Sequence, residues 1–299
     1  MTMRDDINRK VIEVLKSKSV VPWQQPWTDA VSTMPVNVLT GIMYRDINPI
    51  LLRIGDVEQQ HVSKWWGTEA QWKLLGGRLL PNAKGVEVCT ATDKPCLVYN
   101  SDCVGGDFGR LRRVPNVQSL TDATDAQGTH LWTKEGRNIK AEKVIKAIGA
   151  DFREQHCDVA QYHRPPLDYI ILPLLEQFRH GRAGVEGYYS TAFHELCHYS
   201  EAQMGWLADP GRSVKERYAL GEWRSEICSA YLCAACGIPP LKNDINFDPR
   251  SNYSVYLKHW LRMMSEDSSM VFRIAKAASD AVTFLLAKSK RGVCSHIPA

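Results

Sequence analysis

The sequence predicts an α+β protein made of an N-terminal α/β domain with a small antiparallel sheet and a mainly helical second domain. Short alternating apolar stretches between residues 85 and 117 are typical of strands. The second half instead contains long segments with helical periodicity. Residues 118–138 are polar and low in large aliphatic side chains, as in a linker. We therefore expect two domains, residues 1–130 and 131–299.

Apolar spacing, caps and breakers define the elements expected in the first domain. In chain order they are a helix at Asp5–Leu15, a proline-pinned aromatic loop at Val21–Trp27, a helix within residues 42–55, a short helix from Thr68 to Leu75 with Thr68 as N-cap, strands at Val86–Thr90 and Cys96–Tyr99, and a glycine-containing turn at 102–109.

The second domain is expected to contain one strand among helices. The strand is assigned to Asp168–Pro173 because the segment is short and β-branched. The expected helices are Ala141–Ile148, Gly187–Met204, Tyr218–Cys236, Ser251–Met264 and Ser269–Ala287.

Composition excludes several classes of protein. The 299 residues are 44% hydrophobic and 23% charged, which is typical of a globular chain. No apolar run approaches the ~20 residues that span a bilayer, and no signal peptide is evident, so we expect a cytoplasmic protein without membrane contact. The nine cysteines fit this expectation, and a net charge of +4 is too small to indicate nucleic-acid binding by itself.

His194-Glu195-Leu196-Cys197-His198 has the spacing of a metallopeptidase site. The two histidines are four residues apart, so a helix presents both on one face within reach of one zinc ion. Glu195 lies about 100° further around the helix, where it can contact a metal-bound water as general base. The alternative, two incidental histidines on a helix, is disfavoured because the apolar flanks predict burial, and burying these groups unpartnered is costly.

A catalytic zinc site needs a third protein ligand, which the sequence places downstream. Glu222 and Glu226 are one turn apart on a predicted helix, an arrangement that matches the glutamate zincins. We assign Glu222 as the metal ligand and Glu226 as the partner of a histidine ring, with Glu226 as the alternative ligand. Asp209 is a minor alternative, and an exposed charged helix face is the functionally neutral reading.

Tryptophans beside basic residues make the first domain a candidate for binding single-stranded DNA. Six of the nine tryptophans lie in the first 140 residues. Aromatic rings stack on bases while cations follow the phosphates. The competing interpretation is that these rings form the core of the domain. The candidate DNA contacts are Arg45, Lys64, Trp66, Lys73 and Arg78.

Several runs of the sequence together resemble one family. They are Val21–Trp27, Tyr44–Asn48, Trp66–Gln71, Leu167–Pro173, Tyr188–Tyr199, Tyr218–Glu222 and Tyr253–Leu286. Nearly the whole chain thus resembles the ArdC-type antirestriction proteins of conjugative plasmids, which are similar to the N-terminal part of TraC-type plasmid primases. The chain departs from the family pattern at Asp46, where glycine is usual, at Gly221-Glu222, where two glutamates are usual, and in a less basic turn at 81–85.

This resemblance implies an N-terminal single-stranded DNA-binding domain, a C-terminal zincin-like metallopeptidase domain and the protection of incoming DNA from host restriction. The expected metal is Zn²⁺, with another divalent ion such as Mn²⁺ as the alternative. Two other functions stay open. One is a peptidase that cleaves a host restriction-related protein recognised by the first domain. The other is a DNA-shielding protein with a vestigial peptidase site.

Overall fold

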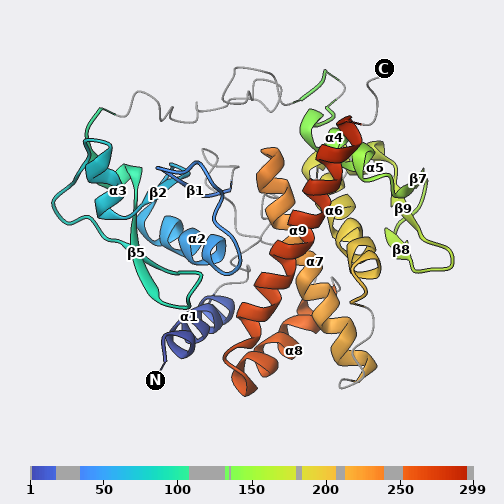
Figure 1. Ribbon diagram of the computed structural model, residues 1–299. Coiled ribbons are helices and arrows are strands. Elements are labelled where there is room, and N and C mark those ends of the chain that lie inside the picture. The colour runs from blue at the N-terminus through green and yellow to red at the C-terminus, as the bar shows by residue number, and fades with distance from the viewer. Residues whose placement is uncertain are drawn as a thin grey trace.

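The computed structural model of the chain describes residues 2–17, 34–107, 132–134, 136–179, 184–206, 213–238 and 252–294 (Figure 1). A small mixed α/β region lies on one side of Figure 1 and a larger helical region on the other. The expected loop Val21–Trp27 and most of the expected linker lie outside the described residues.

As far as it is described, the N-terminal region consists of short strands, three α-helices and one 3-10 helix. The elements are α1 (Met3–Ser17), β1 (Val36–Asn37), α2 (Asn48–Gln59), β2 (Trp65–Gly67), α3 (Glu69–Leu74), β3 (Arg78–Leu79), β4 (Val86–Cys89), β5 (Pro95–Asn100), the 3-10 helix η1 (Ser101–Cys103) and β6 (Val104–Gly105). One sheet has the order β1-β2-β5-β4, with β1 parallel to β2 and the other pairs antiparallel. Strands β3 and β6 form a separate antiparallel pair. The expected α/β fold with a small sheet is confirmed.

The β4–β5 hairpin follows the predicted alternation. Val86 pairs with Val98 and both are buried, whereas Glu87 between the buried positions is exposed. The buried side packs against α2, and Gly55 permits the close approach because a side chain there would collide with Val86. Residue alternation in the sequence thus predicts which side of the hairpin is buried.

Helix α2 begins at Asn48, within the expected segment, after the chain turns at Asp46. This residue has φ +59°, the left-handed region that glycine adopts at least cost. Its N–H donates to Ser279 Oγ at 2.8 Å, and its carbonyl accepts from the Tyr231 hydroxyl at 2.7 Å. These two hydrogen bonds to the C-terminal region stabilise Asp46 in a backbone conformation that is unfavourable for residues other than glycine.

Nine elements form the C-terminal region as it is described. They are α4 (Ile139–Ile148), β7 (Asp151–Gln155), β8 (Gln161–His163), β9 (Tyr169–Pro173), α5 (Leu175–Arg179), α6 (Gly184–Gln203), α7 (Val214–Cys236), α8 (Asn252–Glu266) and α9 (Met270–Cys294). The strands form one sheet in the order β7-β9-β8, with β9 parallel to β7 and antiparallel to β8. Of these three strands, only β9 was expected from the sequence.

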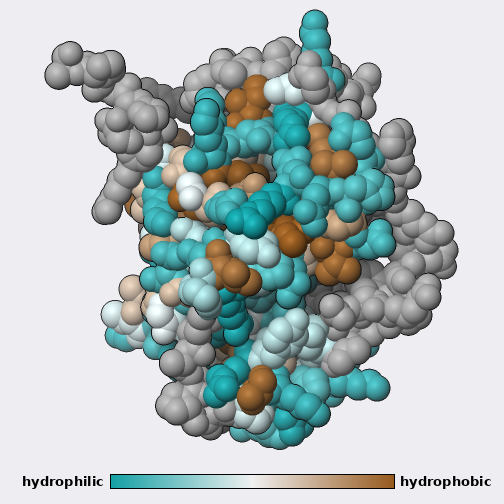
Figure 2. Space-filling model, turned by 90° about the vertical axis from the view of Figure 1, so that its right-hand side faces the viewer, coloured by the Kyte–Doolittle hydropathy of each residue, from teal (hydrophilic) through white to brown (hydrophobic). Residues whose placement is uncertain are grey.

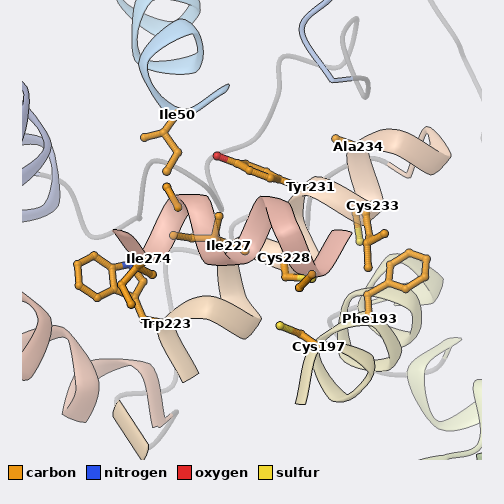
Figure 3. Close-up of a cluster of buried hydrophobic side chains, with 14 of the residues drawn as sticks. Ile50, Phe193, Cys197, Trp223, Ile227, Cys228, Tyr231, Cys233, Ala234 and Ile274 are labelled. Carbon is orange, nitrogen blue, oxygen red and sulfur yellow. The ribbon is translucent and has the colours of Figure 1, made fainter. Parts of the chain in front are cut away.

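The core of this region lies between α6, α7 and α9. In Figure 3, Cys197 of α6 and Cys228 of α7 point toward one another, and Ile50 of α2 lies beside Tyr231. Most buried hydrophobic residues of the two regions form one continuous cluster, and Val38, Trp72 and Val104 form a second, small one. Helix α6, which carries the metal motif, belongs to the larger cluster and is packed on several sides. Among the helices that the structure describes, none is long and apolar enough to cross a membrane.

Candidate metal centre

Two histidines of α6 and one glutamate of α7 bring their donor atoms together. His194 Nε2 lies 3.2 Å from His198 Nε2 and 3.3 Å from Glu222 Oε2. His198 Nε2 lies 3.5 Å from Glu222 Oε1. Within the described residues, these three form the only group of His, Cys, Asp or Glu donors close enough to hold a metal ion, with ligand atoms within 4.8 Å of one another.

This donor set suits a divalent metal. Two imidazole nitrogens and one carboxylate oxygen are the ligands of many catalytic zinc sites, which keep a further position open. The same donors also accept manganese. The side chains are partly buried rather than exposed, so the carboxylate and rings are held by packing instead of moving freely in solvent. The geometry therefore fits the metal expected for the motif.

A second set of side chains contacts the far nitrogens of the two histidine rings. Glu226 Oε1 lies 3.5 Å from His194 Nδ1, the relation expected for Glu226. His198 Nδ1 faces Ser225 Oγ at 3.2 Å and Glu201 Oε2 at 3.5 Å. Such partners fix the orientation and tautomer of a metal-binding ring.

Sequence reasoning missed Glu201 and its partner. Glu201 is almost completely buried, and its Oε1 accepts a 2.8 Å hydrogen bond from Arg224 Nε. Arg224 therefore belongs to a buried ion pair rather than to an exposed charged face. The position of Glu201, three residues after His198, is a weak signal, because the pairing depends on how α6 and α7 pack.

Glu195 lies against β8, an edge strand of the three-stranded sheet. It is buried, and its Oε2 accepts a 2.7 Å hydrogen bond from the backbone N–H of Tyr162 in β8. One carboxylate oxygen is thereby fixed to the backbone. The general-base candidate thus has a defined position beside the histidines.

A cleft with a volume of about 610 Å³ opens over these groups. Its walls come from β8 and its flanking loops, from α6 and from α7, and they include His163, Arg164 and Tyr218. Figure 2 views the molecule from the side of β7, β8 and β9, where hydrophilic residues dominate and hydrophobic ones form separate groups. The cleft is large enough for a segment of a peptide.

The carboxylates set the protonation of the metal-free histidines. Burial alone would lower the pKa of His198, but hydrogen bonds with Glu201 and Glu222 outweigh burial and raise its pKa to about 9. The pKa of His194 is likewise raised, against burial, by Glu222 and Glu226. Burial opposes ionisation of Glu222, yet the two histidines hold its pKa well below the usual range. Without metal, the raised pKa values favour positively charged histidines and the lowered pKa of Glu222 favours its carboxylate, so opposite charges compensate one another in the donor set.

The candidate DNA residues do not share one environment. Arg45 Nη2 lies 3.2 Å from Asp280 Oδ1 of α9, and the Arg45 side chain is half exposed. Lys73 pairs with Glu69 at 2.6 Å on the exposed side of α3, and Arg78 is exposed on the adjacent β3. Lys64 Nζ lies 5.2 Å from the Trp65 ring, and burial followed by repulsion from Lys140 lowers its pKa.

The expectation that Trp66 contacts DNA needs a correction. Its side chain is fully buried in the core, with its ring edge-on to His61 at 5.4 Å between centroids. A ring without exposed surface cannot stack on a base, so Trp66 is a core residue in this fold. The pattern of aromatic and basic residues does not distinguish a stacking ring from a packed one.

Comparisons with known proteins match both regions. A family model described as a zincin-like metallopeptidase matches residues 139–278, and one described as the N-terminal domain of anti-restriction factor ArdC matches residues 1–102. The fold and site thus define a protein with a zincin-like domain behind an ArdC-type N-terminal domain.

The crystal structure of the antirestriction ArdC protein from plasmid R388, in its Mn(II)-bound form, is 26% identical, with 97% of this chain and 98% of that chain covered and a TM-score of 0.68. The metal-free structure of that protein gives a TM-score of 0.70. The present chain therefore belongs to the ArdC family of antirestriction proteins.

Two curated relatives extend the comparison. DNA primase TraC from Escherichia coli is 29% identical over 320 residues, covering 97% of this chain. The chain spans only about a quarter of the length of that relative, 27%. The uncharacterized protein y4eC from Sinorhizobium fredii is 26% identical, covering 93% of this chain and 88% of the relative.

Proposed function

We propose that this protein binds single-stranded DNA entering a new host through its N-terminal region and carries a gluzincin-type metallopeptidase centre. The observation that carries the peptidase proposal is the convergence of His194, His198 and Glu222 beside Glu195, at the base of a cleft. The ArdC family supports the antirestriction role. We place this activity in the cytoplasm, where incoming DNA meets restriction enzymes.

In this proposal the metal ligands are His194, His198 and Glu222, and the native ion is zinc, with manganese as the alternative. The Mn(II)-bound R388 relative supports a divalent ion. A divalent ion held there would supply Lewis-acid polarisation of a peptide carbonyl. Glu226, Ser225 and Glu201 orient the two rings through their far nitrogens.

Glu195 acts as the general base in the proposed reaction. Its Oε2 is held by the Tyr162 N–H, which fixes the carboxylate beside the ligands. The carboxylate accepts a proton from the attacking water and passes it to the leaving amine. Strand β8 lines the same cleft, so a peptide bound there lies beside this strand.

The peptidase proposal is tested by Glu195→Gln. We expect the variant to keep its metal and its thermal stability but to cleave about 10²- to 10⁴-fold more slowly, the usual contribution of a general base. A mixed-sequence peptide library analysed by mass spectrometry serves as substrate. Glu13→Gln, an exposed glutamate of α1, is the matched control. Equal cleavage by Glu195→Gln and by the wild type would refute the role of Glu195.

The DNA proposal relies on exposed basic residues of the N-terminal region, principally Lys73 and Arg78. Arg45 and Lys64 remain further candidates. We expect a fluorescent oligo-dT to bind the full-length protein with a marked salt dependence. The double variant Lys73→Ala/Arg78→Ala should reduce the slope of log K against log salt by about 0.7 for each lost phosphate contact.

The matched control for that experiment is Lys143→Ala/Lys146→Ala, which removes two exposed lysines from α4. This control should leave both affinity and slope unchanged. A wild-type slope near zero, or an equal loss in the two double variants, would contradict DNA binding through the N-terminal region.

The second candidate function is cleavage of a host restriction-related protein, with the N-terminal region as recognition module. The ordered position of Glu195 favours it, because a vestigial site would not need an oriented base. Transfer of unmodified DNA into a restricting host separates the possibilities. If Glu195→Gln protects DNA as well as the wild type, DNA shielding is sufficient. If protection is lost while oligo-dT binding persists, proteolysis is required.

A further inference from the structure

The metal cleft has an apolar surface that the proposed reaction does not use. In the described part of the C-terminal region, the exposed large apolar side chains are Val159, Leu167, Val214 and Tyr218. Three of these four, Val159, Leu167 and Tyr218, line the cleft over the metal ligands. Single exposed apolar residues are common on protein surfaces, whereas several that gather at one concave site mark a binding surface.

Two of the three residues lie at the ends of β8. Val159 is in the loop that joins β7 to β8, and Leu167 is in the loop that joins β8 to β9. Between these loops, Tyr162 of β8 donates its backbone N–H to Glu195 at 2.7 Å. The two apolar side chains therefore belong to opposite ends of the strand that contacts the proposed general base.

Tyr218 adds apolar surface to the wall formed by α7. It lies one turn of the helix before Glu222, and its ring is 5.7 Å from the ring of Tyr256 in α8. A tyrosine presents a large apolar ring with a polar group only at its tip. Apolar surface is thus present on both the β8 side and the α7 side of the cleft.

Most charged groups of the lining are already engaged with one another. His194, His198 and Glu222 face each other as the proposed ligands, and Glu195 accepts the hydrogen bond from β8. Arg164 is the one other Lys, Arg, Asp or Glu that lines the cleft. The exposed apolar side chains are therefore the main groups outside the metal centre that can distinguish one substrate from another.

We propose that the metal cleft selects peptides with a large apolar side chain, such as Leu or Phe, next to the bond that is cleaved. The inference rests on the proposed peptidase function and adds the class of its substrate. A peptide bound in the cleft lies beside β8, so its side chains near the metal reach Val159 or Leu167. Such a contact removes apolar surface from water on both partners, which favours binding.

The test uses peptides that are identical except for Leu, Ser or Lys at one position near the cleaved bond, with each position varied in turn. We expect Leu to raise kcat/KM about 10-fold over Ser at a position next to the bond. This is the lower end of the ~10- to 200-fold that one methylene group contributes in an enclosed apolar pocket, because the surface remains partly in contact with water.

Variants of the two loop residues test which side chains produce the preference. Leu167→Ser and Val159→Ser should each reduce the advantage of Leu over Ser, and at different peptide positions, because the two residues belong to opposite ends of β8. Leu167→Glu should make Lys the favoured residue at its position. Leu97→Ser on β5 is the matched control, since Leu97 is 48% exposed and Leu167 60%.

The control should change no preference, and thermal unfolding checks that each variant is folded. A wild type that does not distinguish Leu from Ser overturns the inference. An equal loss of preference in Leu97→Ser and Leu167→Ser also overturns it.

A binding measurement separates this inference from the peptidase proposal. Fluorescein-labelled Leu and Ser peptides are titrated into full-length, zinc-loaded Glu195→Gln protein. Tighter binding of the Leu peptide that disappears when Leu167→Ser and Val159→Ser are added supports the apolar surface even if the wild type cleaves no peptide. Equal binding of the two peptides, with equal cleavage by the wild type, overturns the inference and leaves the peptidase proposal intact.

Two further measurements test other occupants of the apolar surface. We expect the sedimentation coefficient of the full-length protein to be the same with and without Leu167→Ser, and oligo-dT to leave the bound Leu peptide in place. A dimer that Leu167→Ser abolishes would mean that a second copy of the chain covers the surface. Displacement of the Leu peptide by oligo-dT would mean that DNA occupies it. Either result overturns the assignment to a peptide side chain.

Discussion

Each half of the molecule contains a group of histidine and carboxylate, buried in the N-terminal region and partly buried in the C-terminal region, and the two groups differ in how their atoms are arranged. In the N-terminal region His61 Nδ1 lies 3.4 Å from Asp56 Oδ1, and His61 Nε2 lies 3.1 Å from Cys103 Sγ. Arg53 Nη1 lies 3.9 Å from the other oxygen of Asp56. Each polar atom faces a different neighbour, and the cationic arginine balances the carboxylate.

In the C-terminal region the donor atoms of His194, His198 and Glu222 converge on one point below a cleft. Both groups combine histidine with a carboxylate, so residue types alone do not define a metal site. What defines a metal site is that the lone pairs of several donors converge on one point and that this point is accessible from solvent. The His61 group connects the end of α2 to η1, and it is a structural network by this criterion.

The sharpest test of this contrast is metal affinity. Glu222→Ala should weaken metal binding by more than the 10- to 100-fold typical of losing a residue behind a ligand, because it removes a ligand itself. Glu226→Ala should fall within that 10- to 100-fold range. Asp56→Asn should leave affinity unchanged. Competition with a chelating dye measures all three, and an equal effect of Glu222→Ala and Glu226→Ala would contradict the ligand assignment.

Stability tests the pair that supports the metal centre. Glu201→Ala leaves the partly buried Arg224 without its carboxylate, and we expect a loss of about 3 kcal/mol of unfolding free energy, as for other broken buried pairs. Glu58→Ala removes an exposed partner of Lys10 and should cost less than ~1 kcal/mol. Urea unfolding of metal-free protein gives both values. A similar small loss at the two positions would mean that the buried pair does not contribute to stability.

The pH dependence of stability tests the N-terminal group. Burial raises the pKa of Asp56 to about 6, against the lowering effects of His61 and Arg53. Between pH ~4 and ~6 the folded state therefore keeps a proton that the unfolded state has lost, so stability falls as pH rises through this range. The fall from Asp56 is at most about 3 kcal/mol. Asp56→Asn should remove it, whereas the exposed Asp158→Asn should retain the wild-type slope.

The smallest change in unfolding free energy is expected for an exposed ion pair that takes no part in a cluster of donor atoms. Arg45 and Asp280 form an ion pair between the two regions, and the Arg45 side chain is half exposed. Arg45→Ala should change the unfolding free energy by less than ~1 kcal/mol. A larger loss in thermal or urea unfolding would show that this contact contributes more to joining the regions than exposed pairs usually do.

Local spacing explains why part of the site was predictable. The four-residue interval between His194 and His198, and again between Glu222 and Glu226, predicts one helix face in each case. Glu201 and Ser225 could not be assigned because their roles depend on the packing of α6 against α7. Tyr162 contributes a backbone N–H, which every residue except proline carries, so no side-chain pattern could identify it.

The same reasoning explains the fold. Thr68 predicts the start of α3 because a capping box is a local signal, and the structure has Thr68 as the cap of that helix. Strand β7 was missed because four of its five residues are exposed and its sequence lacks apolar alternation. Trp66 was misjudged because an aromatic ring beside a lysine occurs both at surfaces and in cores. Tertiary context decides such cases.

Helix α1 has a consequence for how the molecule unfolds. Asn8 Nδ2 donates to the Met264 carbonyl at 2.9 Å, and Asp5 accepts from Ser268 Oγ at 2.7 Å, so α1 is attached to the C-terminal helices. On its other side Arg4 pairs with Asp93 in the β4–β5 turn. The first helix of the chain thus bridges both regions, as Figure 1 shows. Loss of α1 would remove support from both at once, which couples their melting into one cooperative transition.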